Sequence, residues 1–209
     1  MNLIKQLNWR YATKQFDNTK KLSNEQLNMI LEATNLSASS FGLQPYHILV
    51  IENSELREKL KAAAWGQSQL TDASHVIIFA AKTNLSDTDI DNFIELVSSV
   101  RGIQVEALSD YSSMMKGSLA KQSDEQKLVW AGKQAYIALG QLLTSCAINN
   151  IDACPMEGFD HDEFDKILGL KEKNLASMVM ATVGYRSEND KYQHLPKVRK
   201  PLDEMVIKY

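Results

Sequence analysis

SDEQKLVWAGKQAYIALGQLLTSCAINN, residues 123–150, is the stretch around which the rest of the chain must fold. It begins with Ser123 followed three residues later by Gln126, the pattern of a capping box that starts a helix. From Leu128 onward most positions are apolar on every side of the helix, so such a helix must be buried on most sides. Its small residues would also let another backbone approach closely, as at the centre of a dimer. We therefore predict a buried helix from residue 123 to about residue 149.

Strands and further helices are predicted on both sides of this helix. Three apolar runs have strand length, namely HILVIE (47–52), HVIIFAAK (75–82) and LASMVMATVGY (175–185). Capping residues and helical spacing predict further helices at 23–36, 54–64, 86–102 and 160–169. Residues 103–122 are weakly periodic and are interpreted as a mobile lid or a pair of short helices. Because helices and strands alternate without a linker, we expect a single α+β domain over residues 1–209.

Composition and charge exclude several classes of protein. The chain has 209 residues, of which 44% are hydrophobic and 23% are charged, and its net charge is −3. No block of basic residues indicates a nucleic-acid or anionic-membrane surface. No apolar run is long enough to cross a bilayer, and the N-terminus lacks the apolar core of a signal peptide. We therefore expect a cytoplasmic protein that binds neither nucleic acid nor a membrane.

The sequence offers little support for hydrolytic, metal-dependent or Rossmann-type chemistry. Neither GxSxG, HExxH, GxGxxG nor a P-loop pattern occurs, and no set of side chains has metal-ligand spacing. In CPMEGFD (154–160), a thiol and a carboxylate stand three residues apart. Cys154 has no arguable histidine partner, so a packing role is favoured over a nucleophilic one. We expect no metal site.

Cationic residues occur near both ends of the chain. RYATKQF (10–16) contains Arg10 and Lys14, whereas LPKVRKP (195–201) contains Lys197 and Arg199. If the tail folds back on the start of the chain, these four side chains could form one pocket for a phosphate monoester, an anion that Arg and Lys bind well. The alternative is that they are separate, solvated surface charges, which is the more common state of such residues.

Five blocks together resemble FMN-dependent nitroreductases in order and spacing. They are RYATKQFD (10–17), SASSFGLQPYHILV (37–50), TDASHVIIFAAK (71–82), CPMEGFD (154–160) and LPKVRKP (195–201). The similarity runs from Leu3 to Pro201, and within the superfamily the chain resembles the oxygen-insensitive NAD(P)H nitroreductase and dihydropteridine reductase group. It implies a central, mostly antiparallel sheet flanked by helices, in an obligate homodimer whose C-terminal arm, about 195–209, packs on the partner. It also implies one tightly bound FMN per subunit, with NAD(P)H as electron donor.

The resemblance assigns flavin-binding roles residue by residue. Arg10, Lys197 and Arg199 would hold the FMN phosphate, and Lys14 would stabilise negative charge at the N1/O2 edge of the reduced ring. Neighbouring and partner-subunit positions complete the expected set, which is Tyr11, Ala12, Ser39, Ser40 and Gly42. Gln67 and Gln69 would contact the pyrimidine, where some relatives have Asn and Lys.

The resemblance implies that CPMEGFD contacts the flavin through its backbone rather than through catalytic side chains. Pro155, Met156, Glu157 and Gly158 would lie against the flavin, with the Glu157 amide directed at N5 and Gly158 adopting a conformation that other residues resist. No side chain is expected to act as acid or base.

The implied reaction is a two-electron, ping-pong transfer of hydride from NAD(P)H to a nitroaromatic, a quinone or a similar acceptor. Phe41, Tyr111 and Met115 are expected at the acceptor. Alternatives remain a dihydropteridine, flavin or enone reductase on the same fold, or a non-catalytic FMN-binding redox sensor.

Overall fold

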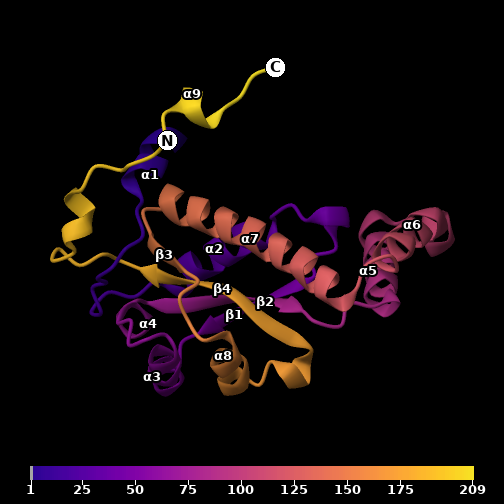
Figure 1. Cartoon of the computed structure of the whole chain (residues 1–209), viewed down its shortest axis with the longest axis horizontal. Helices are drawn as coiled ribbons and strands as arrows, with labels where there is room; N and C mark the ends of the chain where they lie inside the picture. Colours follow the sequence, from indigo (N-terminus) through magenta and orange to yellow (C-terminus); the bar gives the residue numbers. More distant parts are fainter. Residues whose placement is uncertain (1) are drawn as a thin grey trace.

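Four antiparallel strands form the centre of the molecule in a computed structural model that describes residues 2–209 (Figure 1). They are β1 (Tyr46–Ile51), β2 (His75–Lys82), β3 (Asp152–Met156) and β4 (Leu175–Gly184), in the order β1-β2-β4-β3. The three predicted strands are confirmed. β3 was not predicted, because it has only five residues and contains Pro155, which a strand accommodates at the edge of a sheet.

Helices surround the sheet and begin at the predicted capping residues. Ser23, Ser86 and Ser123 each form a capping box, and Gly102 and Gly169 end their helices in the left-handed conformation. The α-helices are α1 (Leu3–Trp9), α2 (Asn24–Asn35), α3 (Ser54–Ala63), α4 (Gln69–Asp72), α5 (Asp87–Arg101), α6 (Ser109–Leu119), α7 (Asp124–Ile148), α8 (His161–Leu168) and α9 (Leu202–Met205). Four short 3-10 helices are η1 (Ser40–Gly42), η2 (Val105–Leu108), η3 (Lys171–Lys173) and η4 (Lys191–His194).

Both faces of the sheet are buried. Ile77 and Phe79 of β2 face the cluster formed with α7 and α2, while Val76 and Ile78 face the cluster formed with α3 and α8. This alternation follows from the two-residue period of a strand. The sheet is therefore sandwiched between α7 with α2 on one side and the shorter helices on the other (Figure 1).

One side of α7 remains exposed within the single chain. Val129, Tyr136 and Ile137 are 58%, 40% and 49% exposed, and Gly140 on the same side has open space where a side chain would stand. Val129 and Tyr136 are seven residues apart, and Tyr136 and Ile137 precede Gly140 by four and three residues, so these positions form one stripe along the helix. The expectation that α7 is buried on most sides is therefore not met by this chain alone.

Residues 87–119, which we call the α5–α6 excursion, project beyond the N-terminal end of α7 (Figure 1). They have a core of their own, with Ile90, Ile94, Leu108, Met115 and Leu119 at its centre. Between α5 and α7 the chain forms η2 and α6, which confirms the interpretation of 103–122 as a pair of short helices. Among the described residues, no helix has the length and apolar character needed to cross a membrane.

Candidate functional site

The N-terminal segment 10–16 runs beside β3, at the open edge of the sheet. Ala12 forms a parallel bridge with Ala153, and Phe16 forms an antiparallel bridge with Arg186. The amide of Thr13 also donates to the carbonyl of Ala153 at 3.4 Å. The segment therefore closes an edge that would otherwise leave backbone groups unpaired, and it carries Arg10 and Lys14 with it. We call the contact between segment 10–16, β3 and residues 186–199 the polar seam.

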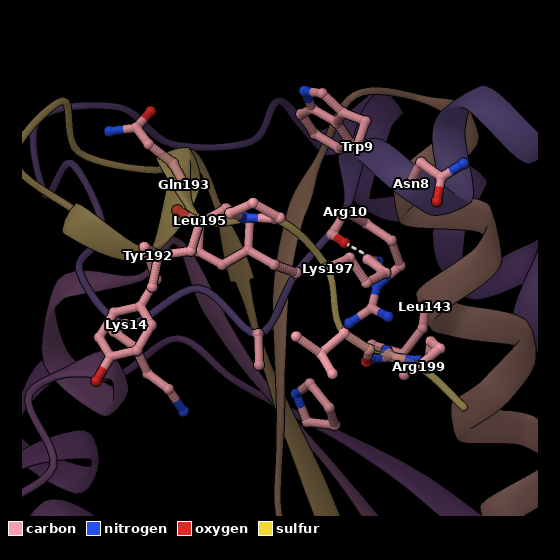
Figure 2. A pocket seen from close by; sticks show the side chains of 15 residues that line it. Asn8, Trp9, Arg10, Lys14, Leu143, Tyr192, Gln193, Leu195, Lys197 and Arg199 are labelled. Carbon is pink, nitrogen blue, oxygen red and sulfur yellow. Dashed lines mark hydrogen bonds between the residues drawn. The ribbon is translucent and has the colours of Figure 1, made fainter. Parts of the chain in front are cut away.

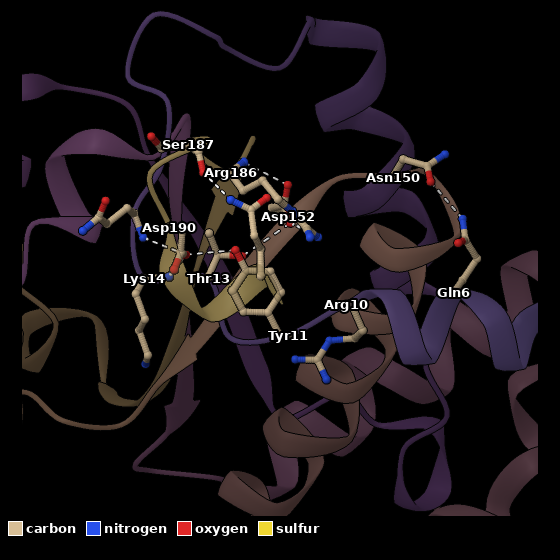
Figure 3. A network of polar contacts seen from close by, with 12 residues as sticks. Gln6, Arg10, Tyr11, Thr13, Lys14, Asn150, Asp152, Arg186, Ser187 and Asp190 are labelled. Carbon is tan, nitrogen blue, oxygen red and sulfur yellow. Dashed lines mark hydrogen bonds and ion pairs between the residues drawn. The ribbon is translucent and has the colours of Figure 1, made fainter. Parts of the chain in front are cut away.

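A buried carboxylate on β3 anchors the first part of the polar seam (Figure 3). Asp152 accepts hydrogen bonds from the backbone amide and Nε of Arg186 at 2.9 and 2.7 Å, and it forms an ion pair with the Nη2 atom of the same residue at 2.6 Å. The Arg186 guanidinium also lies 4.2 and 4.6 Å from the ring centroids of Trp9 and Tyr11. This arrangement fixes residues 9–11 against the end of β4.

A second buried carboxylate, Asp190, anchors the other end of the seam (Figure 3). Its Oδ2 atom accepts from the amides of Lys14 and Gln15 at 2.8 and 3.1 Å and from the Tyr11 hydroxyl at 2.9 Å, and its Oδ1 atom accepts from the Tyr192 amide at 3.0 Å. Burial alone would raise the pKa of this carboxyl, but the hydrogen bonds outweigh burial and lower it below its usual value. Asp190 is therefore ionised at neutral pH.

The four candidate cations line one pocket of about 520 Å³ (Figure 2). Arg10, Lys197 and Arg199 gather in one part of the pocket, and Lys14 lies apart from them. Lys197 donates from its ammonium to the carbonyls of Leu7, at 2.6 Å, and Arg10. Tyr11 and Ala12 also line the pocket, as does Leu143 of α7.

The charge of this pocket is not balanced within the chain. In the part of the chain that the structure describes, no carboxylate lies within 4 Å of the charged nitrogens of Arg10, Lys14, Lys197 or Arg199. Burial and the neighbouring Arg199 lower the pKa of Arg10, and burial together with Arg10 and Arg199 lowers the pKa of Lys197. The Nε atom of Arg10 is buried without a hydrogen-bond partner. A multiply charged anion would relieve both the repulsion and the unpaired donor.

The CPMEGFD stretch leaves β3 next to this pocket. Pro155 lines the pocket, Met156 is buried in the strand, and Glu157 is exposed. The direction of the Glu157 amide stays a prediction, but Gly158 does not have the positive φ that would require glycine, so the special conformation expected of it is wrong. Glycine is needed there for space instead, because a Cβ atom would stand 2.8 Å from the ring of Trp65.

The two glutamines expected at the flavin differ in their surroundings. The Gln67 amide donates to the carbonyls of Gly158 at 2.7 Å and Ala64 at 3.1 Å, so it holds the turn after β3 in place. Gln69 is buried at the start of α4. A contact of Gln69 with the cofactor remains a prediction, whereas both amide hydrogens of Gln67 are directed within the chain.

Cys154 is buried at the floor of the polar seam. Its Sγ atom lies 3.9 Å from the Lys14 ammonium, and burial raises the pKa of the thiol despite that neighbour. A buried, protonated thiol is a poor nucleophile. The structure therefore favours the packing role over a Cys–Glu pair.

A second group of predicted residues lies elsewhere, against the α5–α6 excursion. The amide of Ser40 donates to Oε1 of the buried Gln134 at 2.8 Å, and the Tyr111 hydroxyl donates to the carbonyl of Phe41 at 2.8 Å. Phe41 has a φ of 61°, a strained value for a non-glycine residue, and Gly42 has a φ of 78°. The loop is thus held in a defined but costly conformation.

Ser39 belongs to the same loop, whereas Met115 does not face solvent. The Ser39 hydroxyl accepts from the amide of Gln44 at 3.1 Å. Met115 is fully buried in the core of the excursion, so its predicted contact with substrate is wrong. Its neighbour Met114 is the exposed methionine of α6. Helical spacing of apolar residues indicates that a helix has a buried side. It does not show which of two adjacent methionines lies on that side.

The predicted site residues thus form two separate groups. Arg10, Tyr11, Ala12, Lys14, Pro155, Lys197 and Arg199 share the cationic pocket. Ser39, Ser40, Phe41, Gly42 and Tyr111 lie around η1 and the excursion, near the opposite end of α7. No residue of the second group lines the cationic pocket.

Sequence reasoning missed the residues that support both groups. Asp152, Arg186, Asp190 and Gln134 were not singled out, although each is a polar residue that the fold places in or beside its core. A signal existed for two of them. Asp152 stands between Ile151 and Ala153, and Gln134 stands on the most apolar helix of the chain, so each is a polar residue that must find a partner.

Comparison with known sequences identifies the relatives of this chain. The sequence model described as the Nitroreductase family matches residues 7–185. A Staphylococcus epidermidis protein, provisionally named an NAD(P)H nitroreductase, is 41% identical over 212 residues, covering 98% of this chain and 95% of that protein. A Bacillus subtilis protein with the same provisional name is 37% identical over 210 residues, covering 95% and 93%.

Solved structures share the fold. The crystal structure of a provisionally named nitroreductase from Bacillus subtilis superposes with a TM-score of 0.88 at 22% identity, covering 99% of this chain and 98% of the other. A second one, from Exiguobacterium sibiricum, was solved in complex with FMN and has a TM-score of 0.85 at 19% identity, covering 100% and 98%. At these identities the likeness establishes the arrangement of helices and strands.

Proposed function

The chain belongs to the nitroreductase family of oxidoreductases, and from this premise we propose that it uses FMN to transfer electrons from NAD(P)H to nitroaromatics, quinones or similar acceptors. The cationic pocket is the observation that carries this proposal. Its three clustered cations, Arg10, Lys197 and Arg199, suit a phosphate monoester, which carries nearly two negative charges and accepts several hydrogen bonds.

The residues of the pocket fit FMN in chemistry as well as in charge. The Nε of Arg10 is a buried donor without an acceptor, and burial together with the neighbouring cations lowers the pKa values of Arg10 and Lys197. A phosphate dianion would accept from that donor and offset the repulsion among the cations. Lys14 stands apart from this cluster, with its ammonium 3.9 Å from Cys154, where it would face the ring rather than the phosphate. The FMN complex of the Exiguobacterium protein, which has the same fold, is consistent with this assignment.

When bound, FMN supplies a two-electron hydride acceptor that NAD(P)H reduces and that a second substrate reoxidises. The chain supplies binding and electrostatics. We propose that the Lys14 ammonium stabilises negative charge on the reduced ring, and that the exposed backbone after Met156, at Glu157, provides an N–H donor to the ring. Cys154 and Glu157 are not required as acid or base, because protons can come from solvent.

We also propose that the protein is a homodimer, since no residue of the η1 group lines the cationic pocket within one chain. A partner would bring its own η1 loop, with Ser39, Ser40 and Gly42, to the cationic pocket of the first chain. The exposed stripe of Val129, Ile137 and Gly140 on α7 offers an apolar surface with a close-approach point, as expected at a dimer contact.

The C-terminal arm would complete this dimer. β1 is an edge strand, and an apolar groove runs beside it, lined by Ile48, Val50, Leu56, Ile167 and Leu170 among others. The arm carries Val206 and Ile207, which are exposed and have no core of their own. We propose that the arm, about 195–209, packs on the partner subunit, where its end adds to the β1 edge by strand addition. The rest of the chain forms one domain.

Anaerobic titration tests the proposed function directly. The purified protein should show the absorbance of bound flavin, which NADH or NADPH should bleach, and a nitroaromatic or quinone should restore it within seconds. Bleaching without reoxidation by any acceptor would instead indicate a redox sensor. Preferential reoxidation by an enone or a dihydropteridine would select the alternative reductases. A protein that neither contains nor binds FMN would contradict the proposal.

A further inference from the structure

Asp190 joins two parts of the chain that are far apart in sequence. It is fully buried, and its two oxygens are divided between the two parts. Oδ2 accepts from the Lys14 and Gln15 amides and the Tyr11 hydroxyl, all in segment 10–16, whereas Oδ1 accepts from the Tyr192 amide, at the start of the tail. One carboxylate thus holds the start of the chain with one atom and the tail with the other.

The partners of Asp190 are neutral groups, not cations. In the described residues Asp190 has no ion pair, and burial together with the hydrogen bond to Asp190 raises the pKa of the Tyr11 hydroxyl, which keeps that donor protonated. A buried carboxylate is costly unless hydrogen-bond donors surround it, and here four do so. None of the pocket's four cations is paired with this carboxylate in the described residues. Its contribution is to fix the position of the backbone of segment 10–16 relative to the backbone at Tyr192.

Those two backbones carry the cations of the pocket. On one side, the bound amide of Lys14 fixes where its side chain leaves the seam, with the ammonium 3.9 Å from Cys154. On the other side, Asp190 is the N-cap of η4, from which the chain continues to Lys197 and Arg199. Displacing either backbone would move Lys14, the cation proposed at the flavin ring, relative to Lys197 and Arg199, which are proposed at the phosphate.

We propose that Asp190 is a positioning residue of the flavin site, which sets both FMN affinity and flavin potential by joining the Lys14 backbone to the tail. This inference rests on the proposed function. In this proposal the Asp190 carboxylate fixes the distance between Lys14 and the two tail cations, Lys197 and Arg199.

Asp190→Asn separates this role from simple burial. An amide has one accepting oxygen and one donating NH2 group. If the oxygen keeps the three donors of segment 10–16, the NH2 group faces the Tyr192 N–H, and two donors oppose each other. The variant therefore retains size and shape but breaks the link between segment and tail.

The matched control is Asp165→Asn. Asp165 is also a buried carboxylate and accepts a backbone hydrogen bond, from Ser177 at 2.8 Å, but it joins α8 to β4 away from the pocket. Both variants should lose thermal stability. Only a positioning role predicts that they differ in their effect on the flavin.

The test measures FMN affinity by quenching of flavin fluorescence and the midpoint potential by dye equilibration. We expect Asp190→Asn to weaken FMN binding by about 10- to 100-fold, because displaced cations would make poorer charge-assisted hydrogen bonds to the phosphate. We expect its flavin potential to be lower than that of wild type, because the Lys14 ammonium stabilises the reduced ring less well. Asp165→Asn should leave both quantities within about twofold of wild type.

Three results would overturn the inference. Asp190→Asn could bind FMN with wild-type affinity and potential, or Asp165→Asn could change both quantities as much. If Asp190→Asn does not fold, hydrogen exchange of wild-type protein decides instead: the Lys14, Gln15 and Tyr192 amides must be protected together, and independent exchange of Tyr192 would refute the link. Failure of wild-type protein to bind FMN would refute the proposed function itself, which distinguishes the two.

Discussion

The polar seam and the α5–α6 excursion are held together by different forces. In the seam, directional hydrogen bonds to the buried Asp190 hold Tyr11, Lys14 and Gln15, and the Arg186 guanidinium, paired with Asp152, stacks on the rings of Trp9 and Tyr11. In the excursion, apolar side chains such as Ile90 and Met115 fill a small core of their own, and the Tyr111 hydroxyl is the polar link to the η1 loop. The two regions stand near opposite ends of α7 (Figure 1).

This difference suits two tasks. Hydrogen-bond networks fix atoms closely, as is needed to hold one particular cofactor, whereas apolar packing tolerates substitution of similar volume. We infer that the seam determines cofactor and chemistry, while the excursion determines which acceptor fits. Substitutions in the seam should therefore have large and uniform effects, and substitutions in the excursion should have small effects that depend on the acceptor.

The largest effect is expected from Arg10→Ala, which removes a half-buried guanidinium of the cationic pocket. Loss of charge-assisted hydrogen bonds to a phosphate should weaken FMN binding by about 100-fold or more. The matched control is Arg101→Ala, at the exposed C-terminal end of α5. Fluorescence titration of the flavin-free proteins measures the change. If Arg10→Ala binds FMN with the affinity of wild type, the polar seam does not bind the cofactor.

Replacing a glycine by alanine should change the free energy of unfolding in opposite directions in the two regions. At Gly184, beside the seam, a Cβ atom would stand 2.9 Å from the Ser74 amide nitrogen and 3.1 Å from the Phe16 ring, so Gly184→Ala should destabilise the protein by about 1–3 kcal/mol. At Gly117 in α6 a Cβ atom meets nothing within 4 Å, and Gly117→Ala should stabilise by up to about 1 kcal/mol.

Urea unfolding at a fixed protein concentration measures both changes. If both substitutions stabilise, the seam is not tightly packed at Gly184. If both destabilise, the excursion is less open than the structure indicates.

Tyr111→Phe tests the excursion with a smaller change. The substitution removes the hydrogen bond to the Phe41 carbonyl, worth about 0.5–1.5 kcal/mol, and frees a strained loop. We expect kcat/KM for the acceptor to change by about three- to tenfold, by amounts that differ between a nitroaromatic and a quinone. Stopped-flow reduction by NADH should be unaffected. A uniform loss in both half-reactions would mean that Tyr111 supports the flavin rather than the acceptor.

Glu157→Gln should have the smallest effect. The side chain is exposed, and the proposed role of this position belongs to its backbone N–H, which glutamine retains. Steady-state turnover should remain within about threefold of wild type, because hydride transfer needs no side-chain acid here. Complete loss of turnover with FMN still bound would instead establish Glu157 as an acid or base.

Much of the framework could be predicted from local patterns. The capping boxes at Ser23 and Ser123 and the apolar runs of β1, β2 and β4 depend on residues near one another in sequence, so the pattern identifies them directly. β3 could not be found in this way. Its five residues include a proline and an aspartate, and they become a strand because β4 and segment 10–16 flank them.

The supporting contacts of the site were beyond the reach of sequence patterns for the same reason. Asp190 reaches Lys14 across 176 positions and Arg186 reaches Asp152 across 34, and no local period encodes such pairs. The resemblance supplied the cations themselves, but not the carboxylates that position them. It also could not show that Met114 rather than Met115 is exposed, because the side that α6 buries depends on how α5 packs against it.

Mixed dimers test most directly the central claim that two chains build each flavin site. Arg10→Ala disables the cationic pocket, and Ser40→Tyr fills the space that the η1 loop would offer to the partner's flavin. Each variant alone should be inactive. Co-expressed with different tags, they should form mixed dimers with one intact site, and the whole population should regain about a quarter of wild-type NADH-dependent turnover. No recovery in isolated mixed dimers would contradict the claim, as would a monomeric, fully active wild-type protein.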